Sequence, residues 1–119
     1  GGLTTKHLIN RQVLDALGPK GFLVNIARAS VVVTADLISA LEQRRIAGAA
    51  LDVFDAEPHV PDALKSLTNV VLTPHVAGLS PEAIEGTVEL VGRNLVAFFS
   101  GQPVLTPVEL PTRISNAVL

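Results

Sequence analysis

Three short apolar runs in this sequence each lead to a side chain that could carry out chemistry. The runs and their side chains are 22–26 with Arg28, 49–53 with Asp52 and Glu57, and 70–72 with His75. If the runs are parallel strands of one sheet, these side chains meet at its carboxyl edge. Open α/β sheets bind their ligands at that edge. The spacing therefore predicts one site built from an arginine, a histidine and carboxylates.

The residue types indicate which reaction such a site could support. An arginine can hold a carboxylate through two parallel hydrogen bonds. A histidine can donate the proton to a carbonyl oxygen that becomes an alcohol, and a carboxylate partner fixes its tautomer. Taken alone, Arg28, Glu57 and His75 would each more often be ordinary surface residues, and Asp52 could equally cap a neighbouring loop. Their convergence on three strand ends favours the reduction of a keto acid.

Capping residues and apolar spacing predict three helices and a single helical turn within 61–67. The expected cap and stop residues are Asn10 and Gly18, Thr34 and Gly48, and Ser80 and Gly101. Proline directly after Ser80 strengthens the third start, and this helix should run for about five turns. The expected apolar stripes are Val13, Leu14 and Leu17; Leu37, Ile38 and Leu41; and Ile84, Val88, Val91, Leu95 and Phe98.

The alternation of helices and strands predicts an α/β fold. We expect part of a Rossmann-like, doubly wound parallel sheet of about three strands, covered on both faces, followed by a long C-terminal helix. A complete sheet of this kind has about six strands, and the sequence contains no methionine. We therefore expect a piece of a longer polypeptide. The sheet domain should span 1–80, and 81–119 should form the helix and a tail that Pro103, Pro107 and Pro111 keep extended.

Composition restricts the class of protein. The 119 residues are 48% hydrophobic with a net charge of −2 and no basic run, which argues against nucleic acid or an anionic membrane as partner. No apolar run is long enough to span a bilayer and no secretory signal is visible, so a cytoplasmic protein is the default expectation. Cysteine is absent, which excludes disulfides and thiol catalysis but says little about compartment. No metal-ligand spacing, serine nucleophile elbow or Gly-rich phosphate loop is present.

Several segments, in order along the chain, resemble one known family. They are 8–10 (LIN), 25–28 (NIAR), 48–54 (GAALDVF), 57–58 (EP), 69–75 (NVVLTPH) and 101–103 (GQP). The sequence resembles the C-terminal part of the NAD(P)-binding domain of D-isomer-specific 2-hydroxy acid dehydrogenases. The likeness is closest to the glyoxylate, hydroxypyruvate and hydroxyphenylpyruvate reductase branch. One departure is Ala29, which stands where the family usually has glycine.

The resemblance implies roles for particular residues. It implies that Arg28 binds the substrate carboxylate and polarises the carbonyl, and that His75, paired with Glu57, is the acid/base. It also implies that Asp52 contacts the nicotinamide carboxamide. The implied cofactor-binding set is Ala27, Arg28, Asp52, His75 and Gly78, with no metal.

The resemblance also implies partners. These are NAD or NADP, a small 2-keto or 2-hydroxy acid, and a second copy bound through the nucleotide-binding domain, while the long helix would return to a substrate domain. The Gly-rich loop and the ribose-reading residue are missing from these 119 residues, so we expect the chain alone to be inactive and to bind no dinucleotide. An alternative is a non-catalytic nucleotide-binding or regulatory protein that keeps the fold. The joint presence of Arg28, Glu57 and His75 speaks against it.

Overall fold

The computed structural model describes residues 2–108 of the chain. These residues fall into two compact units, one up to Leu79 and one from Ser80 onward. The first unit contains a sheet with its helices, and the second contains one long helix and the segment that follows it. No helix among the described residues is long and apolar enough to cross a membrane.

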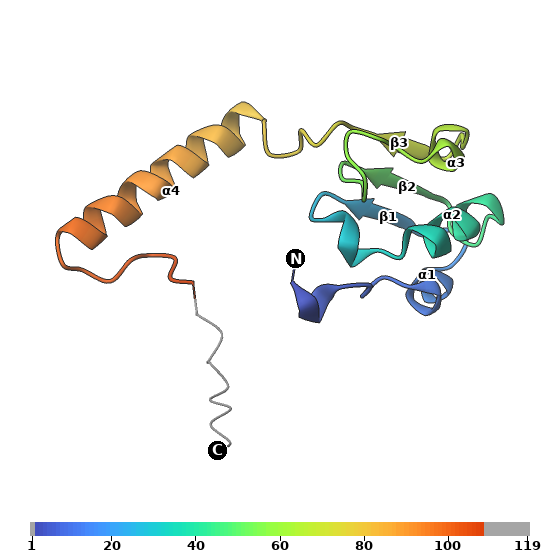
Figure 1. The fold of residues 1–119 in the computed structure, drawn as a ribbon, viewed down its shortest axis with the longest axis horizontal. Coiled ribbons are helices and arrows are strands. Elements are labelled where there is room, and N and C mark those ends of the chain that lie inside the picture. The colour runs from blue at the N-terminus through green and yellow to red at the C-terminus, as the bar shows by residue number, and fades with distance from the viewer. Residues whose placement is uncertain (1, 109–119) are drawn as a thin grey trace, which may run out of the picture. The chain divides into compact units, whose positions relative to one another are not determined.

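A three-stranded parallel sheet forms the centre of the first unit. Its strands are β1 (Phe22–Asn25), β2 (Gly48–Leu51) and β3 (Val70–Leu72), in the spatial order β1-β2-β3. Figure 1 shows the three arrows pointing the same way. The register places Asn25, Leu51 and Leu72 in one row at the carboxyl edge. The predicted open parallel sheet, with its three strands, is therefore confirmed.

Three helices accompany the sheet: α1 (Arg11–Leu17), α2 (Thr34–Glu42) and the short α3 (Asp62–Lys65). Two single 3-10 turns, η1 (Leu3–Thr5) and η2 (Ala29–Val31), lie in the loops. The cap predicted for α1 is confirmed, because Oδ1 of Asn10 accepts from the backbone N–H of Gln12 at 3.0 Å and of Val13 at 3.3 Å. Gly18 then ends the helix with φ +75°, which glycine adopts without strain.

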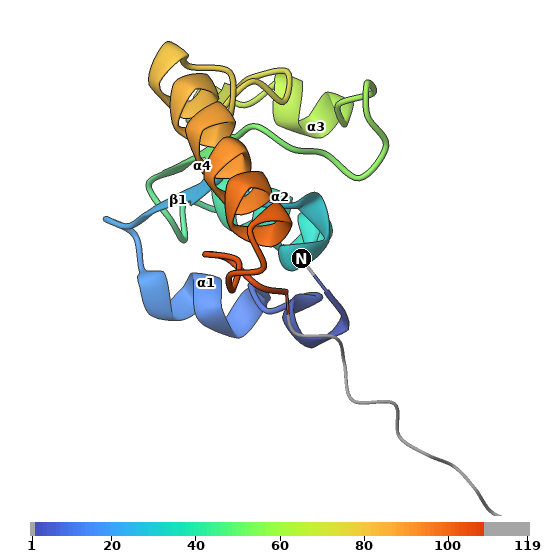
Figure 2. The ribbon, with the colours of Figure 1, turned by 90° about the vertical axis from the view of Figure 1, so that its left-hand side faces the viewer.

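One face of the sheet carries the hydrophobic core. Buried side chains from all three helices and from β2 form a single cluster, which includes Leu14, Leu37, Leu41, Leu64, Ala49 and Leu51. Figure 2 shows the ribbon of Figure 1 turned by 90° about the vertical axis. The other face bears Phe22, Val24 and Val71, which are 70%, 64% and 62% exposed. The prediction that both faces are covered is thus wrong for the described residues, because these helices all pack on one side.

Two local predictions in the first unit are also wrong. Thr34 is the first residue of α2 and not its cap; Val33 holds that position without a side-chain bond. The Thr34 hydroxyl instead donates to Oδ2 of Asp55 at 2.6 Å. Gly48 does not end the helix but begins β2, where a Cβ atom would lie 2.6 Å from the carbonyl oxygen of Asn69. Close approach of the neighbouring backbone therefore requires this glycine.

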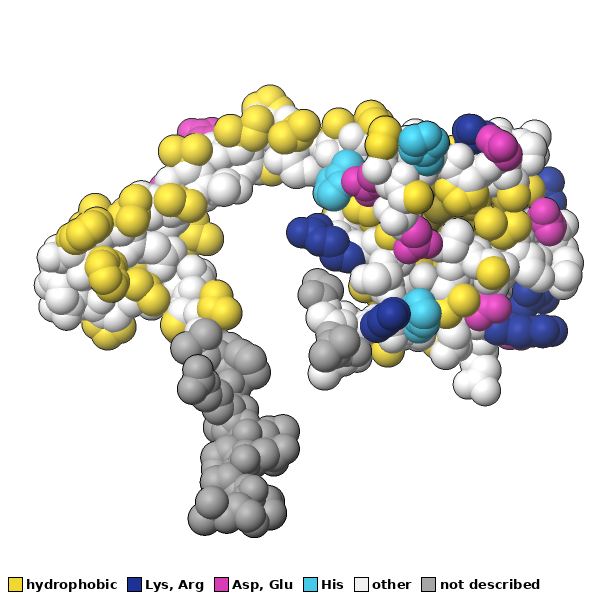
Figure 3. Space-filling model, viewed as in Figure 1, with side chains coloured by type: hydrophobic (Ala, Val, Ile, Leu, Met, Phe, Trp, Pro, Cys, Tyr) yellow, Lys and Arg dark blue, Asp and Glu magenta, His cyan; other side chains and the backbone are white. Residues whose placement is uncertain are grey.

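The second unit is built on α4 (Pro81–Phe99), and its predicted start is confirmed because Ser80 Oγ accepts from Ala83 N–H at 3.2 Å. The segment after the helix turns back along it, since Asn94 and Thr106 exchange two hydrogen bonds of 3.0 and 3.2 Å. Figure 3 shows hydrophobic side chains along much of α4. All five residues of the predicted stripe are at least 48% exposed. Pro111, expected to extend the tail, lies outside the described residues.

Candidate active site

Arg28 stands three residues beyond the end of β1, on a turn that Asn25 closes. Asn25 is buried in the strand, with 6% of its surface exposed. Its Oδ1 accepts from the backbone N–H of Ala27 at 3.1 Å, and its Nδ2 donates to the carbonyl oxygen of Arg28 at 3.1 Å. Arg28 itself is exposed, and its Nη1 donates to the carbonyl oxygen of Ala27 at 2.7 Å. The strand end therefore fixes the backbone from which the guanidinium projects.

Ala29 opens η2, directly after Arg28. Its backbone is not among those with positive φ in the described chain, so a side chain is accommodated here without strain. The departure from the family's usual glycine therefore leaves the course of this loop compatible with alanine.

Asp52 lies just past β2 and is almost completely buried, with 3% of its surface exposed. Its Oδ1 accepts from the Thr73 hydroxyl at 2.5 Å and from Val76 N–H at 2.9 Å, and its Oδ2 accepts from Ala77 N–H at 2.9 Å. The hydrogen bond from Thr73, followed by those from the two amides, lowers the pKa of Asp52 below its usual value against the opposing effect of burial. Asp52 is therefore an ionised carboxylate that binds the loop after β3.

Glu57 and His75 form a pair at the same edge. Oε2 of Glu57 lies 2.9 Å from Nδ1 of His75, and Oε1 accepts from the backbone N–H of Phe54 at 2.9 Å. The hydrogen bond with His75, and then that with Phe54, lower the pKa of Glu57. An ionised carboxylate only accepts, so Nδ1 must carry the proton of this contact. Nε2 of His75 is thereby left for a substrate.

All three residues predicted as catalytic line one open depression of about 440 Å³. Its walls are Arg28, Ala29, Ser30, Val53, Phe54, Asp55, Glu57 and His75. A second, more apolar depression of about 510 Å³ lies against the same pair of Glu57 and His75, with Pro58, Val60, Leu72 and Pro74 among its walls. Glu57 and His75 thus lie between the depression that contains Arg28 and a more hydrophobic one.

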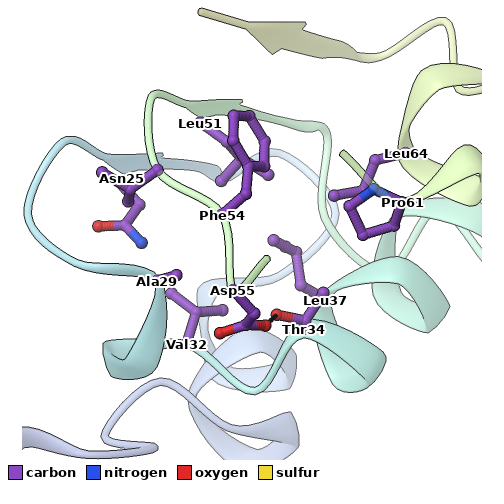
Figure 4. A pocket seen from close by; sticks show the side chains of 11 residues that line it. Asn25, Ala29, Val32, Thr34, Leu37, Leu51, Phe54, Asp55, Pro61 and Leu64 are labelled. Atoms are coloured by element: carbon purple, nitrogen blue, oxygen red, sulfur yellow. Dashed lines mark hydrogen bonds between the residues drawn. The ribbon is translucent and has the colours of Figure 1, made fainter. Parts of the chain in front are cut away.

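A much smaller cavity of about 20 Å³ (Figure 4) lies beside the depression that contains Arg28. Ala29, Val53, Phe54 and Asp55 border both spaces, and a hydrogen bond joins Thr34 to Asp55 in the lining of the smaller one. A cavity needs about 10–15 Å³ to hold one water molecule. This space could therefore admit about one water molecule and is too small for a substrate.

The predicted cofactor set also includes Ala27, Asp52 and Gly78. These three lie near the depression that contains Arg28 but are not part of its walls. Ala27 is exposed, and its carbonyl oxygen accepts from Arg28. Asp52 is covered by the loop that carries His75, and it accepts from the N–H of Val76 in that loop. Gly78 is exposed in the turn that follows, and a Cβ there would meet nothing within 4 Å. Within residues 2–108 no group of three His, Cys, Asp or Glu residues could hold a metal ion.

Sequence reasoning missed three groups that hold the site together: the side chain of Asn25, the hydroxyl of Thr73 and the N–H of Phe54. A signal existed for Asn25, because a lone amide inside an apolar strand needs local hydrogen-bond partners. The amide of Phe54 carried no sequence signal at all, since every residue except proline has one.

Comparison with known proteins identifies the family of this chain. Residues 3–77 match the family described as D-isomer specific 2-hydroxyacid dehydrogenase, NAD binding domain. The chain therefore belongs to the D-isomer specific 2-hydroxyacid dehydrogenases. The predicted family and its glyoxylate, hydroxypyruvate and hydroxyphenylpyruvate reductase branch are thereby confirmed.

Individual relatives give the extent of the likeness. Hydroxyphenylpyruvate reductase of Plectranthus scutellarioides is 54% identical over 104 residues, which are 87% of this chain and 33% of that protein. Glyoxylate reductase of Thermococcus onnurineus is 50% identical over 115 residues, 97% of this chain and 33% of that protein. The chain thus spans about a third of the length of these relatives.

Solved structures share the fold. The NADPH-dependent glyoxylate/hydroxypyruvate reductase of Sinorhizobium meliloti, in complex with NADP and malonate, matches with a TM-score of 0.76 at 50% identity. The match covers 91% of this chain and 34% of that one. D-mandelate dehydrogenase of Rhodotorula graminis matches with a TM-score of 0.79 at 33% identity, over 92% of this chain and 32% of that one. The Rossmann-like assignment is therefore confirmed.

Proposed function

We propose that a protein containing this chain reduces small 2-keto acids to D-2-hydroxy acids with NADPH or NADH. The observation that supports this most directly is the single depression lined by Arg28, Glu57 and His75. It brings together a carboxylate-binding cation and a proton donor with an anionic partner. Relatives named as glyoxylate and hydroxypyruvate reductases support the same reaction class.

The chemistry of the chain's own residues follows from their geometry. Arg28 binds the substrate carboxylate through two hydrogen bonds and places the neighbouring carbonyl near His75. The nicotinamide, when bound, supplies the hydride that adds to the carbonyl carbon. Protonated His75 gives the proton on Nε2 to the carbonyl oxygen and is left as a neutral imidazole. Glu57 accepts from Nδ1 throughout, which keeps the ring oriented with Nε2 toward the substrate.

The residues at the carboxyl edge fit a nicotinamide cofactor. A carboxylate has about four lone-pair sites, and Asp52 uses three for Thr73, Val76 and Ala77. One acceptor site is left for the amine of a carboxamide. The open space around Gly78 would admit a ring close to the backbone. Ala27 and Arg28 would flank the other side of the same cofactor.

Three finer features belong to this proposal. Glyoxylate and hydroxypyruvate are the substrates named for several relatives, and we propose them first. We also propose a homodimer that forms through the nucleotide-binding domain, and a cytoplasmic location. Sedimentation analysis and fluorescent tagging in cells would check these two features.

The activity is tested by following nicotinamide absorbance in a dehydrogenase that contains this chain, with glyoxylate and then hydroxypyruvate. His75→Ala removes the proton donor, so kcat should fall by about 10²–10⁴-fold with little change in cofactor affinity. Arg28→Ala should raise KM for the keto acid and lower kcat, because a carboxylate clamp serves both binding and reaction.

A matched control is His59→Ala, which removes an exposed loop imidazole outside the depression and should leave kcat unchanged. Absence of turnover with every 2-keto acid tried would count against the enzyme and favour a non-catalytic nucleotide-binding protein. A wild-type kcat in His75→Ala would exclude the proposed proton donor even if turnover were observed.

A further inference from the structure

The loop that carries His75 is tied down by one buried carboxylate. The three groups that donate to Asp52 belong to Thr73, Val76 and Ala77, so they bracket His75 on both sides along the chain. The bonds measure 2.5, 2.9 and 2.9 Å, and Asp52 is 97% buried. Hydrogen bonds to an ionised acceptor are about twice as strong as neutral ones. The loop is therefore held to the end of β2.

His75 needs such a support because of its backbone conformation. Its φ is +57°, in the left-handed region that residues with a side chain adopt at a cost. His7 and Arg44 have similar φ angles, so this conformation alone does not mark a functional residue. What distinguishes His75 is the buried carboxylate of Asp52, which binds the chain on both sides of this residue, at Thr73 and at Val76 and Ala77. Strained positions persist where the surrounding structure holds them in this way.

Of the three donors, Thr73 alone donates through its side chain. Val76 and Ala77 donate through backbone N–H groups, which almost any residue would provide. The Thr73 hydroxyl is also the largest single influence that keeps the Asp52 carboxylate ionised. No hydrogen bond joins Thr73 to the imidazole or to Glu57 in the described structure. An effect of Thr73 on chemistry would therefore have to act through Asp52 and the loop.

We propose that Thr73 is a positioning residue, whose hydroxyl binds Asp52 and thereby sets where the His75 imidazole stands relative to Glu57 and Arg28. The proposal rests on the proposed role of His75 as proton donor. Proton transfer needs donor and acceptor within hydrogen-bond reach, and displacement of about 1 Å can cost 10²-fold in rate. Loss of the hydroxyl therefore reduces the rate of the chemical step more than it weakens the binding of substrate.

The kinetic test compares Thr73→Val, which removes the hydroxyl at nearly constant volume, with Thr73→Ser, which keeps it. In a dehydrogenase containing this chain, Thr73→Val should lower kcat by roughly 10–100-fold with KM for the keto acid within about 2-fold. Thr73→Ser should retain most of kcat. Thr68→Val, at an exposed threonine before β3, is the matched control and should behave as wild type.

A structural readout does not depend on turnover. Proton NMR of the wild-type 119-residue chain should show a downfield imidazole N–H signal from the Nδ1 to Glu57 contact. In Thr73→Val that signal should broaden or vanish, and the amide signals of Val76 and Ala77 should move, while those of core residues such as Leu14 and Leu41 stay unchanged. Thr73→Ser should keep the wild-type spectrum. A residue that merely stabilised the fold would not produce this selective change.

The outcomes separate this inference from the proposed function. If the wild type reduces no keto acid but the N–H signal depends on the Thr73 hydroxyl, the positioning stands and the proposed function fails. If turnover occurs and Thr73→Val keeps both kcat and the signal, the positioning fails. Equal losses in Thr73→Ser and Thr73→Val would also overturn it. Should Thr73→Val not fold, Thr73→Ala removes the same hydroxyl and carries the same expectations.

Discussion

Each functional side chain of the candidate site depends on a second polar group that fixes its backbone or its orientation. Asn25 closes the turn below Arg28, the N–H of Phe54 binds one oxygen of Glu57, and Asp52 holds the loop of His75. These supports come from the strand ends themselves or from residues next to them. At the scale of single residues, the site is therefore supported by hydrogen bonds that exist before any ligand arrives.

The pairing of Glu57 with His75 predicts a dependence of stability on pH. The pKa of Glu57 is lowered from the usual 4.5, first by its hydrogen bond with His75. A carboxyl group with a lower pKa in the folded chain contributes stability above its usual pKa, and this is lost as pH falls through the folded value. Between these values the unfolded chain binds more protons. The free energy of unfolding should therefore fall more steeply with acidification in wild type than in Glu57→Gln.

Urea unfolding of the chain at a series of pH values from about 7 down to 3 would measure this difference. Glu85→Gln, which removes an exposed carboxylate on α4, is the control and should follow the wild-type curve. Parallel curves for wild type and Glu57→Gln would show that the pair contributes nothing to the folded state.

At the scale of elements, the first unit relies on short helices that need their ends satisfied. α1 has seven residues, too few to be stable by itself, and Leu14 is its buried contribution to the core. Oδ1 of Asn10 bonds two N–H groups at its start. Asn10→Ala should therefore lower the free energy of unfolding by about 1 kcal/mol, within a range of roughly 0.5–2 kcal/mol.

The matched control is Asn10→Ser, because serine caps helices about as well as asparagine and should retain most of the stability. Both variants would be measured by urea unfolding at pH 7. A serine variant as unstable as the alanine variant would mean that some contact of the asparagine other than capping is responsible.

At the scale of the whole molecule, two apolar surfaces are left exposed. One is the open sheet face with Phe22, Val24 and Val71, and the other is the stripe along α4. Exposed apolar surfaces of this kind mark interaction sites or promote aggregation. The 119-residue chain should therefore self-associate, and light scattering should report a mass that rises with concentration.

Val24→Thr combined with Val71→Thr should reduce this association, because threonine keeps the β-branched shape while adding a hydroxyl. A matched control is Val13→Thr, at an exposed position on α1 that belongs to neither surface. A wild-type chain that stays monomeric at every concentration would contradict the prediction.

The comparison of sequence and structure shows which features a pattern can predict. Arg28, Glu57 and His75 could be predicted to converge, since apolar runs of strand length place their ends at one edge of a parallel sheet. The supporting roles of Asn25 and Thr73 were missed, because they depend on where loop amides and carbonyls lie in space. Gly48 was misread as a helix stop, since nothing local in the sequence indicates that Asn69 approaches it.

The two wrong predictions about burial and capping have a similar origin. The residues of β1 are apolar on both faces, but that pattern does not reveal which other part of a protein covers each face. Thr34 has a side chain suited to capping, yet Asp55 offers its hydroxyl a carboxylate partner from a distant loop. Local propensity was overruled in both cases by contacts that form only in the folded chain.

Arg28, Glu57 and His75 all belong to the unit that ends at Leu79. Their mutual distances are therefore set within one packed unit. A rotation of the segment that begins at Ser80 would leave Arg28, the proposed carboxylate clamp, in place relative to Glu57 and His75. In an enzyme built on this chain, such a rotation would therefore keep the proposed catalytic geometry intact between turnovers.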